Sequence, residues 1–439
     1  MRLLNPILEN FFKDEAERKK VITVIIPSFI IQSLSVLLSF GISIILAHGL
    51  GVSDYGVFTY VFSIVFLVVN LSSAGLNILV VRETSSLLAA GKIQLLSGFF
   101  RWSTLIVLTA CIVLAIVLCV LTYYCHIMPD ESYTAPMLLA AISIPFYGLL
   151  SFYTSFLRGI NKIVFSLVSE SIVKHITFFV AIVAIYFFVK KMALIDIIYI
   201  NTITFVISAL AGLVILKRSI ALKNETAYDT KVWWGKLGSL FLLNGLLGIE
   251  SRIDMIMLGY MKDPSQVGIF SAVGKIAAFL SFFLMTMNFI IAPIISKWNT
   301  LSEKQQLQKM ITKSIRWVML LSLPLFIVIV VFSKPILYFF FGKDFEQGQS
   351  ALIILSCAYL VSIMFGPVGN IMTMTGNEKY YTIFTFCSIV ITVILNFILI
   401  PSMGYNGAAI ATASSIVFWN TGLYIVTKRK LGISAWIFG

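Results

Sequence analysis

Charged residues are scarce in this chain: only 12% of its 439 residues are Asp, Glu, Lys or Arg, while 59% are hydrophobic. A soluble globular domain carries about 25% charged residues. A chain this apolar could not cover its surface with polar groups in water, which excludes a soluble enzyme, a nucleic-acid-binding domain and a disordered scaffold. The alternating segments of about ten residues that mark a membrane β-barrel are also lacking. The sequence therefore predicts an all-α integral membrane protein.

Residues that bind metals or form disulfides are few as well. The chain has five Cys and three His, with no CxxC pair and no Cys/His cluster. We therefore expect no disulfide, no metal site and no resident cofactor. A polysaccharide polymerase or membrane glycosyltransferase would need acidic residues in a large outer loop, and Asp130-Glu131 is the nearest match. We predict that the protein is not an enzyme.

Long apolar runs make up most of the sequence. The hydrocarbon core of a bilayer needs about 20 apolar residues per helix. Runs of this kind, separated by short polar segments, lie at roughly 21–47, 56–79, 99–122, 137–157, 163–189, 194–216, 237–260, 267–295, 314–333, 350–374, 380–400 and 407–427. These positions predict about 12 transmembrane helices.

Basic residues are distributed unevenly between the two sides of these runs. With the N-terminus placed in the cytoplasm, 24 of the 32 Lys and Arg residues fall in cytoplasmic segments and 5 in the opposite loops. Because cytoplasmic loops collect Lys and Arg, we predict that both termini are cytoplasmic. The same bias explains the net charge of +13 without invoking nucleic acid.

The longest linker in the middle of the chain divides the twelve runs into six and six. We predict that the chain is divided into a cytoplasmic N-terminal segment (1–20), an N-lobe (21–216), a cytoplasmic linker (217–236), a C-lobe (237–427) and a cytoplasmic C-terminal tail (428–439).

Two short motifs recur in matching positions of the two halves. The segment SDYGVF at 53–58 is echoed by SQVGIF at 265–270, and RGINK at 158–162 by TGNEK at 375–379. The two pairs have nearly equal offsets, and halves of six spans repeat with the same orientation. This pattern predicts two six-helix lobes related by an axis along the membrane normal, as in two-lobed transporters.

Several ionisable residues lie within the predicted spans, where charges are rare and usually face a cavity or a partner. In the fifth span, Glu170 and Lys174 share a helix face and could pair. A continuous seventh span would place Glu250 and Asp254 on one face and Arg252 about 200° away from each.

Further charges lie in the eighth span and near the cytoplasmic ends. Lys275 is predicted at a depth similar to that of Asp254, while Arg82, Glu83 and Arg158 lie near cytoplasmic ends. The alternatives for these groups are internal salt bridges, interfacial anchors, or a functional site.

The stretch from Ala47 to Phe58 (AHGLGVSDYGVF) resembles the first outer loop of polysaccharide-transport flippases, which belong to the multidrug/oligosaccharidyl-lipid/polysaccharide (MOP) exporter superfamily. Other segments fit the same pattern in order and spacing: Val80-Val81-Arg82-Glu83, Arg158-Gly159 with Asn161, Arg252-Ile253-Asp254 with Leu258-Gly259, and Val267 to Ser271. The span count, the length and the six-plus-six duplication agree with this resemblance.

The resemblance implies a flippase that moves undecaprenyl-pyrophosphate-linked oligosaccharide, such as an O-antigen repeat unit, across the bacterial inner membrane. A cationic cavity between the lobes would lower the barrier for the pyrophosphate and the glycan, with the prenyl tail in lipid. The residues expected to bind the cargo are Arg252, Lys275, Lys174, Arg82 and Arg158. Those expected to couple an ion or pair with the cations are Asp254, Glu250, Glu170 and Glu83. Membrane lipids and other glycan-assembly proteins are the expected partners.

Competing functions follow from the same fold. A cation-coupled multidrug or metabolite exporter shares the twelve-span plan, but its acidic residue usually lies in the first span, and 21–47 contains no Asp or Glu. A membrane enzyme would need a large outer loop with acidic residues, and this sequence has no such loop. A scaffold of a glycan-assembly complex would not need the charges inside the spans.

Overall fold

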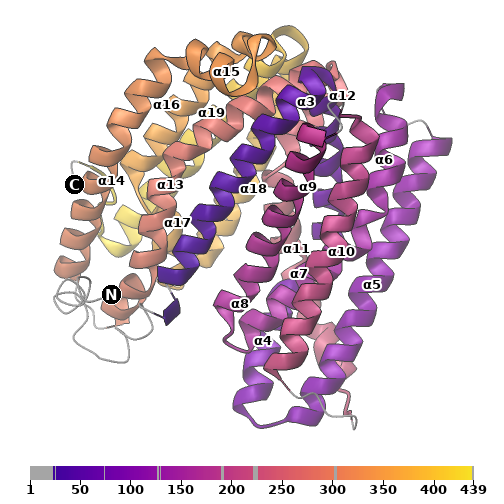
Figure 1. Ribbon diagram of the computed structural model, residues 1–439. Helices are drawn as coiled ribbons and strands as arrows, with labels where there is room; N and C mark the ends of the chain where they lie inside the picture. The colour runs from indigo at the N-terminus through magenta and orange to yellow at the C-terminus, as the bar shows by residue number, and fades with distance from the viewer. Residues whose placement is uncertain are drawn as a thin grey trace.

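The computed structural model describes residues 23–24, 26–73, 75–125, 128, 130–188, 192–220, 226–300 and 304–437 (Figure 1). Helices dominate these residues because a backbone in hydrocarbon must satisfy its hydrogen bonds within its own segment. The predicted N-terminal segment 1–20 and part of the predicted linker, 221–225, lie outside the described residues.

The helices follow one another in this order: α3 (Ile26–Ser73), α4 (Leu76–Ala89), α5 (Ile93–Tyr124), η2 (Glu131–Tyr133), α6 (Thr134–Ala141), α7 (Ser143–Gly159), α8 (Ile163–Leu167), η3 (Val168–Val173), α9 (Lys174–Phe188), α10 (Leu194–Ser219), α11 (Thr230–Glu250), α12 (Ile253–Met261), α13 (Pro264–Thr300), α14 (Lys304–Val331), α15 (Ser333–Phe341), η4 (Lys343–Gly348), α16 (Gln349–Phe365), α17 (Val368–Met374), α18 (Glu378–Met403) and α19 (Tyr405–Leu431).

The predicted spans fall on these helices, some on a single helix and others on two or three consecutive elements. Within the described residues, 9 helices are long and apolar enough to cross a membrane, or up to 10 if the bent pair α6 and α7 is one span. Helix α3 has 48 residues and contains a non-helical residue, Gly51, at a kink, so that it holds both of the first two predicted runs. At 1.5 Å per residue its length is about 72 Å, twice what one crossing needs. The all-α, multi-pass fold is confirmed.

The helices form two lobes (Figure 1). The N-lobe contains α3 to α10, in which α7 packs against α4, α5 and α10, and the C-lobe contains α11 to α19, in which α19 packs against α16 and α18. The lobes meet along α3 and α13. We call the end of the bundle where α10 ends and α11 begins the linker end, and the other the opposite end.

Several predicted spans are broken rather than continuous. Helices α6 and α7 are bent by 48° at Ile142. The seventh span breaks between α11 and α12, where Arg252 has φ −136° and ψ −9°. The tenth breaks at Gly366, whose φ is 63°, followed by Pro367. Such breaks are tolerated in membranes where neighbouring helices or a cavity take up the freed backbone groups.

The two copies of the repeated motif pack against each other across the lobes. A Cβ added to Gly56 of α3 would lie 1.8 Å from the carbonyl oxygen of Pro264, and one added to Gly268 of α13 would lie 2.3 Å from that of Val52. Both contacts are backbone to backbone, so only glycine fits on either side. The crossing lies close to the Gly51 kink, and therefore near the opposite end.

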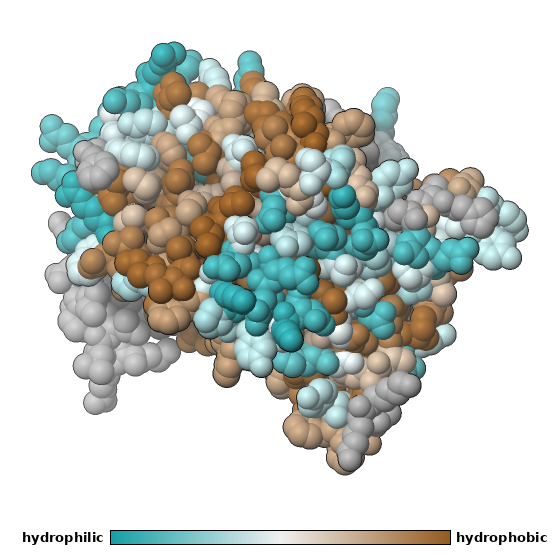
Figure 2. All heavy atoms as spheres, turned by 90° about the horizontal axis from the view of Figure 1, so that it is seen from above, coloured by the Kyte–Doolittle hydropathy of each residue, from teal (hydrophilic) through white to brown (hydrophobic). Residues whose placement is uncertain are grey.

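The surface carries the polarity expected of a membrane protein. Figure 2, which views the opposite end, shows hydrophilic residues gathered in the middle with hydrophobic residues beside them. Large apolar side chains are exposed along the helices, including Phe187 at 70% and Phe339 at 76%. In the described residues these side chains face the space that lipid would fill.

Candidate functional site

A cavity of about 600 Å³ lies between the lobes and is lined by both of them. Its walls come from α3, α7, α9 and α10 of the N-lobe and from α11, α12, α13, α16 and α19 of the C-lobe. Its polar lining consists of Ser39, Ser43, Tyr55, Thr59, Ser63, Tyr147, Lys174, His175, Asn201, Glu250, Ser251, Arg252, Asp254, Ser271, Lys275, Tyr359 and Thr412. Five of the nine residues proposed from the sequence therefore meet in one space.

Lys174 lies in this cavity between two aromatic rings. Its Nζ is 5.4 Å from the centroid of Tyr147 and 5.2 Å from that of Phe205. Both distances are within the range of a cation–π interaction. No ion pair to Lys174 occurs in the part of the chain that the structure describes.

The predicted pairing of Glu170 with Lys174 is wrong. Glu170 pairs instead with the guanidinium of Arg158, which also donates to Ser166 Oγ at 3.1 Å. Residues Val168–Val173 form a π-helical turn in this span, and Glu170 lies in that turn within reach of Arg158. The turn directs Glu170 to α7 and leaves Lys174 to the cavity.

Arg252 reaches the cavity because the seventh span is broken. The guanidinium carbon lies 4.8 Å from the centroid of the Phe66 ring of α3. Its Nε is buried without a hydrogen-bond partner among the described residues. The continuous helix expected from the sequence would have turned Arg252 away from Glu250 and Asp254. The break brings all three to the same cavity.

Lys275 completes a group of three cations from three spans. Its Nζ donates to Ser39 Oγ of the other lobe at 2.8 Å. Lys174, Arg252 and Lys275 all line the same cavity. In the described residues none of the three is neutralised by an ion pair. We call Lys174, Arg252 and Lys275 the cation triad.

The acidic residues lie on the C-lobe side of the cavity. Asp254 accepts hydrogen bonds from Asn396 Nδ2 at 2.7 Å and from Thr412 Oγ1 at 2.9 Å. With Glu250 it also lines a second cavity of about 320 Å³ inside the C-lobe. The Oδ1 atom of Asn396 is buried and has no partner within the described part. Hard cations prefer oxygen ligands. The carboxylate of Asp254 and the free amide oxygen of Asn396 are ligands of this kind.

The remaining predicted residues lie away from the cavity. Arg82 is exposed on α4, and Glu83 accepts from Lys236 Nζ at 2.5 Å. Arg158 and Glu170 pair with each other outside the cavity. The structure thus separates the nine candidates into a cavity group and a group at the linker end.

Sequence reasoning missed the groups that hold the charged side chains. The rings of Phe66, Tyr147 and Phe205 contact the cations of Arg252 and Lys174. Aromatic residues are common in membrane helices, so their presence in the sequence does not indicate such a contact. Asn396 was detectable, because an amide inside an apolar run needs a partner. Its partner, Asp254, could not be named without the fold.

A helical membrane protein with two lobes around a polar cavity has the architecture of an alternating-access carrier. The comparisons with known proteins define its family. Residues 23–299 match the family described as "Polysaccharide biosynthesis protein", and residues 242–398 match the MatE family. The chain belongs to the polysaccharide biosynthesis protein family, and its resemblance to polysaccharide-transport flippases of the MOP superfamily is confirmed.

Two curated relatives act in glycan biosynthesis by their descriptions. The chain is 33% identical over 174 residues to a "Probable low-salt glycan biosynthesis flippase Agl15" of Haloferax volcanii, which covers 40% of this chain and 37% of that protein. It is 24% identical over 190 residues to the "Capsular polysaccharide biosynthesis protein CapF" of Staphylococcus aureus, covering 42% and 47%. The chain thus aligns with less than half the length of these curated relatives.

Solved structures share the fold over nearly the whole chain. An inward-facing multidrug resistance MATE family transporter of the MOP superfamily superposes with a TM-score of 0.75 at 12% identity, covering 91% of this chain and 94% of that one. The lipid II flippase MurJ, in an inward closed conformation, gives 0.74 at 16% identity, covering 92% and 87%. At 12% and 16% sequence identity, these similarities show that the fold is shared and say nothing about the substrate.

Proposed function

We propose that this protein is a flippase for a lipid-linked oligosaccharide, carried on undecaprenyl pyrophosphate, such as an O-antigen or related surface-glycan repeat unit. The observation that carries the proposal is the cation triad, three cations in the inter-lobe cavity with no ion pair among the described residues. Unpaired charges at membrane depth are costly and mark a substrate path. An anionic headgroup would supply the missing countercharge.

The chemistry of the cavity suits both parts of such a headgroup. A pyrophosphate presents several acceptor oxygens, and the planar guanidinium of Arg252 can bind two of them at once. The hydroxyls and amide of Ser43, Thr59, Ser63 and Asn201 line the same space and offer hydrogen bonds to sugar hydroxyls. The prenyl tail has no need to enter and stays in lipid.

Translocation follows from movement of the lobes about the bound headgroup. The crossing at Gly56 and Gly268 holds the lobes together near the opposite end. Rocking the lobes about the cavity would then expose it to each side of the membrane in turn. If the cations bind the cargo equally well in both conformations of the lobes, this binding gives transport no direction. The direction then comes from an ion gradient or from removal of the cargo after release. We assign ion coupling to Asp254 with Glu250.

The orientation rests on the charge distribution. The linker end carries the Lys and Arg residues that place it in the cytoplasm by the positive-inside rule. We therefore propose a location in the bacterial cytoplasmic membrane, with cargo loaded at the linker end and released at the opposite end. The partners proposed are the cargo, membrane lipids and other glycan-assembly proteins.

A second candidate is a cation-coupled multidrug or metabolite exporter. The match of residues 242–398 to the MatE family and the oxygen donors around Asp254 favour it. The cation triad speaks against it for cationic drugs, because like charges in one cavity repel. An exporter would move its drug in liposomes and leave the lipid-linked glycan where it is.

The test is transfer of undecaprenyl-pyrophosphate-linked glycan between the leaflets of liposomes that contain the purified protein. Charge-neutral variants Arg252→Gln and Lys174→Gln are compared with Lys217→Gln, an exposed cation at the end of α10. Each lost charged hydrogen bond is worth about 1.5–3 kcal/mol, so transfer should fall roughly tenfold or more in the first two and stay unchanged in the third. Equal transfer by all folded variants would refute the role of the triad.

A further inference from the structure

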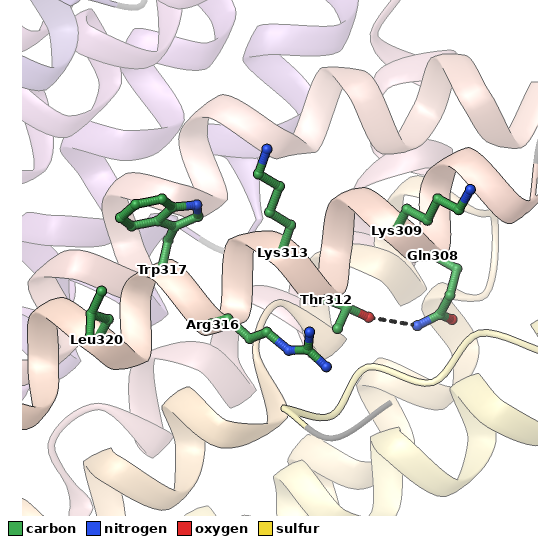
Figure 3. Close-up of a pocket in the computed structure, with 7 residues that line it drawn as sticks. All are labelled: Gln308, Lys309, Thr312, Lys313, Arg316, Trp317 and Leu320. Carbon is green, nitrogen blue, oxygen red and sulfur yellow. Dashed lines mark hydrogen bonds between the residues drawn. The ribbon is translucent and has the colours of Figure 1, made fainter.

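A groove separate from the inter-lobe cavity runs along the linker-end half of α14 (Figure 3). It has a volume of about 540 Å³ and is lined by Gln308, Lys309, Thr312, Lys313, Arg316, Trp317 and Leu320. We call these residues the basic groove. None of them lines the cavity between the lobes.

The cations of the groove recur at helical spacing. Lys309, Lys313 and Arg316 lie at i, i+4 and i+7, so that one cation follows another at about each turn of α14. All three are exposed. Lys309 and Lys313 have no carboxylate partner in the described residues. Lys309 and Lys313 therefore present positive charge that no carboxylate of the described residues balances.

The segment that follows α19 forms a fixed wall beside the groove. Gln308 Nε2 donates to the carbonyl oxygen of Ser434 at 2.8 Å, and the Ser434 amide donates back to Gln308 Oε1 at 2.7 Å. Arg316 Nε donates to the carbonyl oxygen of Ile437 at 3.2 Å. Figure 3 shows Arg316 directed toward this segment, with Lys309 and Lys313 on the other side of the helix ribbon. Ala435 is fully buried, so the wall is part of the fold.

The other end of the groove is apolar. Trp317 is 57% exposed and Leu320 is 60% exposed, and both lie further along α14, toward the middle of the predicted span. Tryptophan prefers the level of lipid headgroups, where its ring meets both water and hydrocarbon. The groove thus changes from cationic to apolar along one helix, in the order in which a phospholipid changes from phosphate to acyl chain.

From this order of charge and apolar surface, we propose that the basic groove binds the phosphate headgroup of an anionic membrane phospholipid, whose acyl chain follows Trp317 and Leu320. Basic pockets at the ends of transmembrane helices recognise such headgroups. A soluble phosphate would contact only the cations of the groove. It would not explain why the exposed apolar side chains of Trp317 and Leu320 continue the groove. The lipid is a resident of this site, separate from the cargo of the inter-lobe cavity.

The experiment is native mass spectrometry of the full-length protein released from bilayers that contain phosphatidylglycerol and phosphatidylcholine. Lys309→Gln/Lys313→Gln is compared with Lys217→Gln/Arg218→Gln, which removes two exposed charges from the end of α10. Each cation near the surface contributes about 1 kcal/mol to anionic lipid binding, so phosphatidylglycerol should be held roughly 30-fold more weakly by the first variant. The control should retain it as the wild type does.

Three results would overturn the proposal. The wild type could lose phosphatidylglycerol as readily as phosphatidylcholine, or both double variants could lose it equally, which would leave only general surface attraction. Alternatively, inorganic phosphate could displace the lipid from the wild type, which would assign the groove to a soluble anion. Thermal unfolding of each variant in detergent checks that the fold is retained, and Lys309→Arg/Lys313→Arg should restore the bound lipid.

Discussion

The guanidinium of Arg252 lies over the ring of Phe66, 4.8 Å from its centroid, and the two residues belong to different lobes. The contact holds a cation at the boundary between the lobes, which the proposed transport cycle would open and close. The Nε atom of the guanidinium has no hydrogen-bond partner among the described residues and can therefore bind an acceptor.

Replacing Phe66 with Leu should weaken cargo transfer without unfolding the protein. The ring contributes about 0.5–2 kcal/mol to holding the cation, so the rate at low cargo concentration should fall roughly 2- to 30-fold. The liposome transfer assay measures this. Phe386→Leu is the matched control, since Phe386 is 53% exposed on α18 and away from the cavity. An unchanged rate in Phe66→Leu would mean that Arg252 is held by other groups.

The glycine crossing should tolerate no added methyl group. In Gly56→Ala the new Cβ would meet the Pro264 carbonyl oxygen at 1.8 Å, so α3 and α13 must move apart near the opposite end. Overpacking of this kind typically costs about 1–3 kcal/mol. We expect a lower unfolding temperature and impaired transfer. Gly235→Ala is the control, because its Cβ would have nothing within 4 Å. A Gly56→Ala protein with wild-type stability and transfer would contradict the crossing.

Arg158 and Glu170 should behave as a structural pair. Their side chains are 40% and 37% exposed, so screening limits the pair to about 1 kcal/mol or less. Arg158→Gln and Glu170→Gln should each lower the unfolding temperature slightly and leave the apparent affinity for cargo unchanged. The double replacement Arg158→Glu/Glu170→Arg should recover part of the stability. A selective loss of cargo affinity in Arg158→Gln would return this residue to the substrate path.

Asp254 should carry the dependence of transport on an ion gradient. Asp254→Asn keeps the shape of the side chain but removes the charge that Asn396 and Thr412 now surround. We expect transfer to stop responding to imposed sodium or proton gradients, while slow transfer down the cargo gradient persists. Asp263→Asn, beyond the end of α12, is the control. A variant Asp254→Asn that still responds to a gradient would exclude Asp254 as the coupling group.

The spans and lobes could be predicted because they depend on properties local to the sequence. About 20 apolar residues make a span wherever they occur, and the polar linker that contains Lys217 and Arg218 separates the halves by composition alone. The cavity residues Lys174, Arg252 and Lys275 could be named for a similar reason, since a cation inside an apolar run needs a functional or structural partner.

The pairing of these charges could not be predicted, because it depends on departures from regular helix. Glu170 lies in the π-helical turn at Val168–Val173 and pairs with Arg158 of α7, and the break at Arg252 turns that side chain into the cavity. Neither departure has a local marker such as proline. The surrounding helices stabilise both, and those contacts join residues far apart in the chain, such as Asp254 with Asn396.

The meeting of Gly56 with Gly268 makes the two positions depend on each other. Each glycine is confined by backbone of the other lobe, so a side chain at either position would separate the same two helices. A second substitution at the other glycine should then cost less than the first, because the separation has already been made. Two glycines that lie far apart in the chain thus act as one structural position.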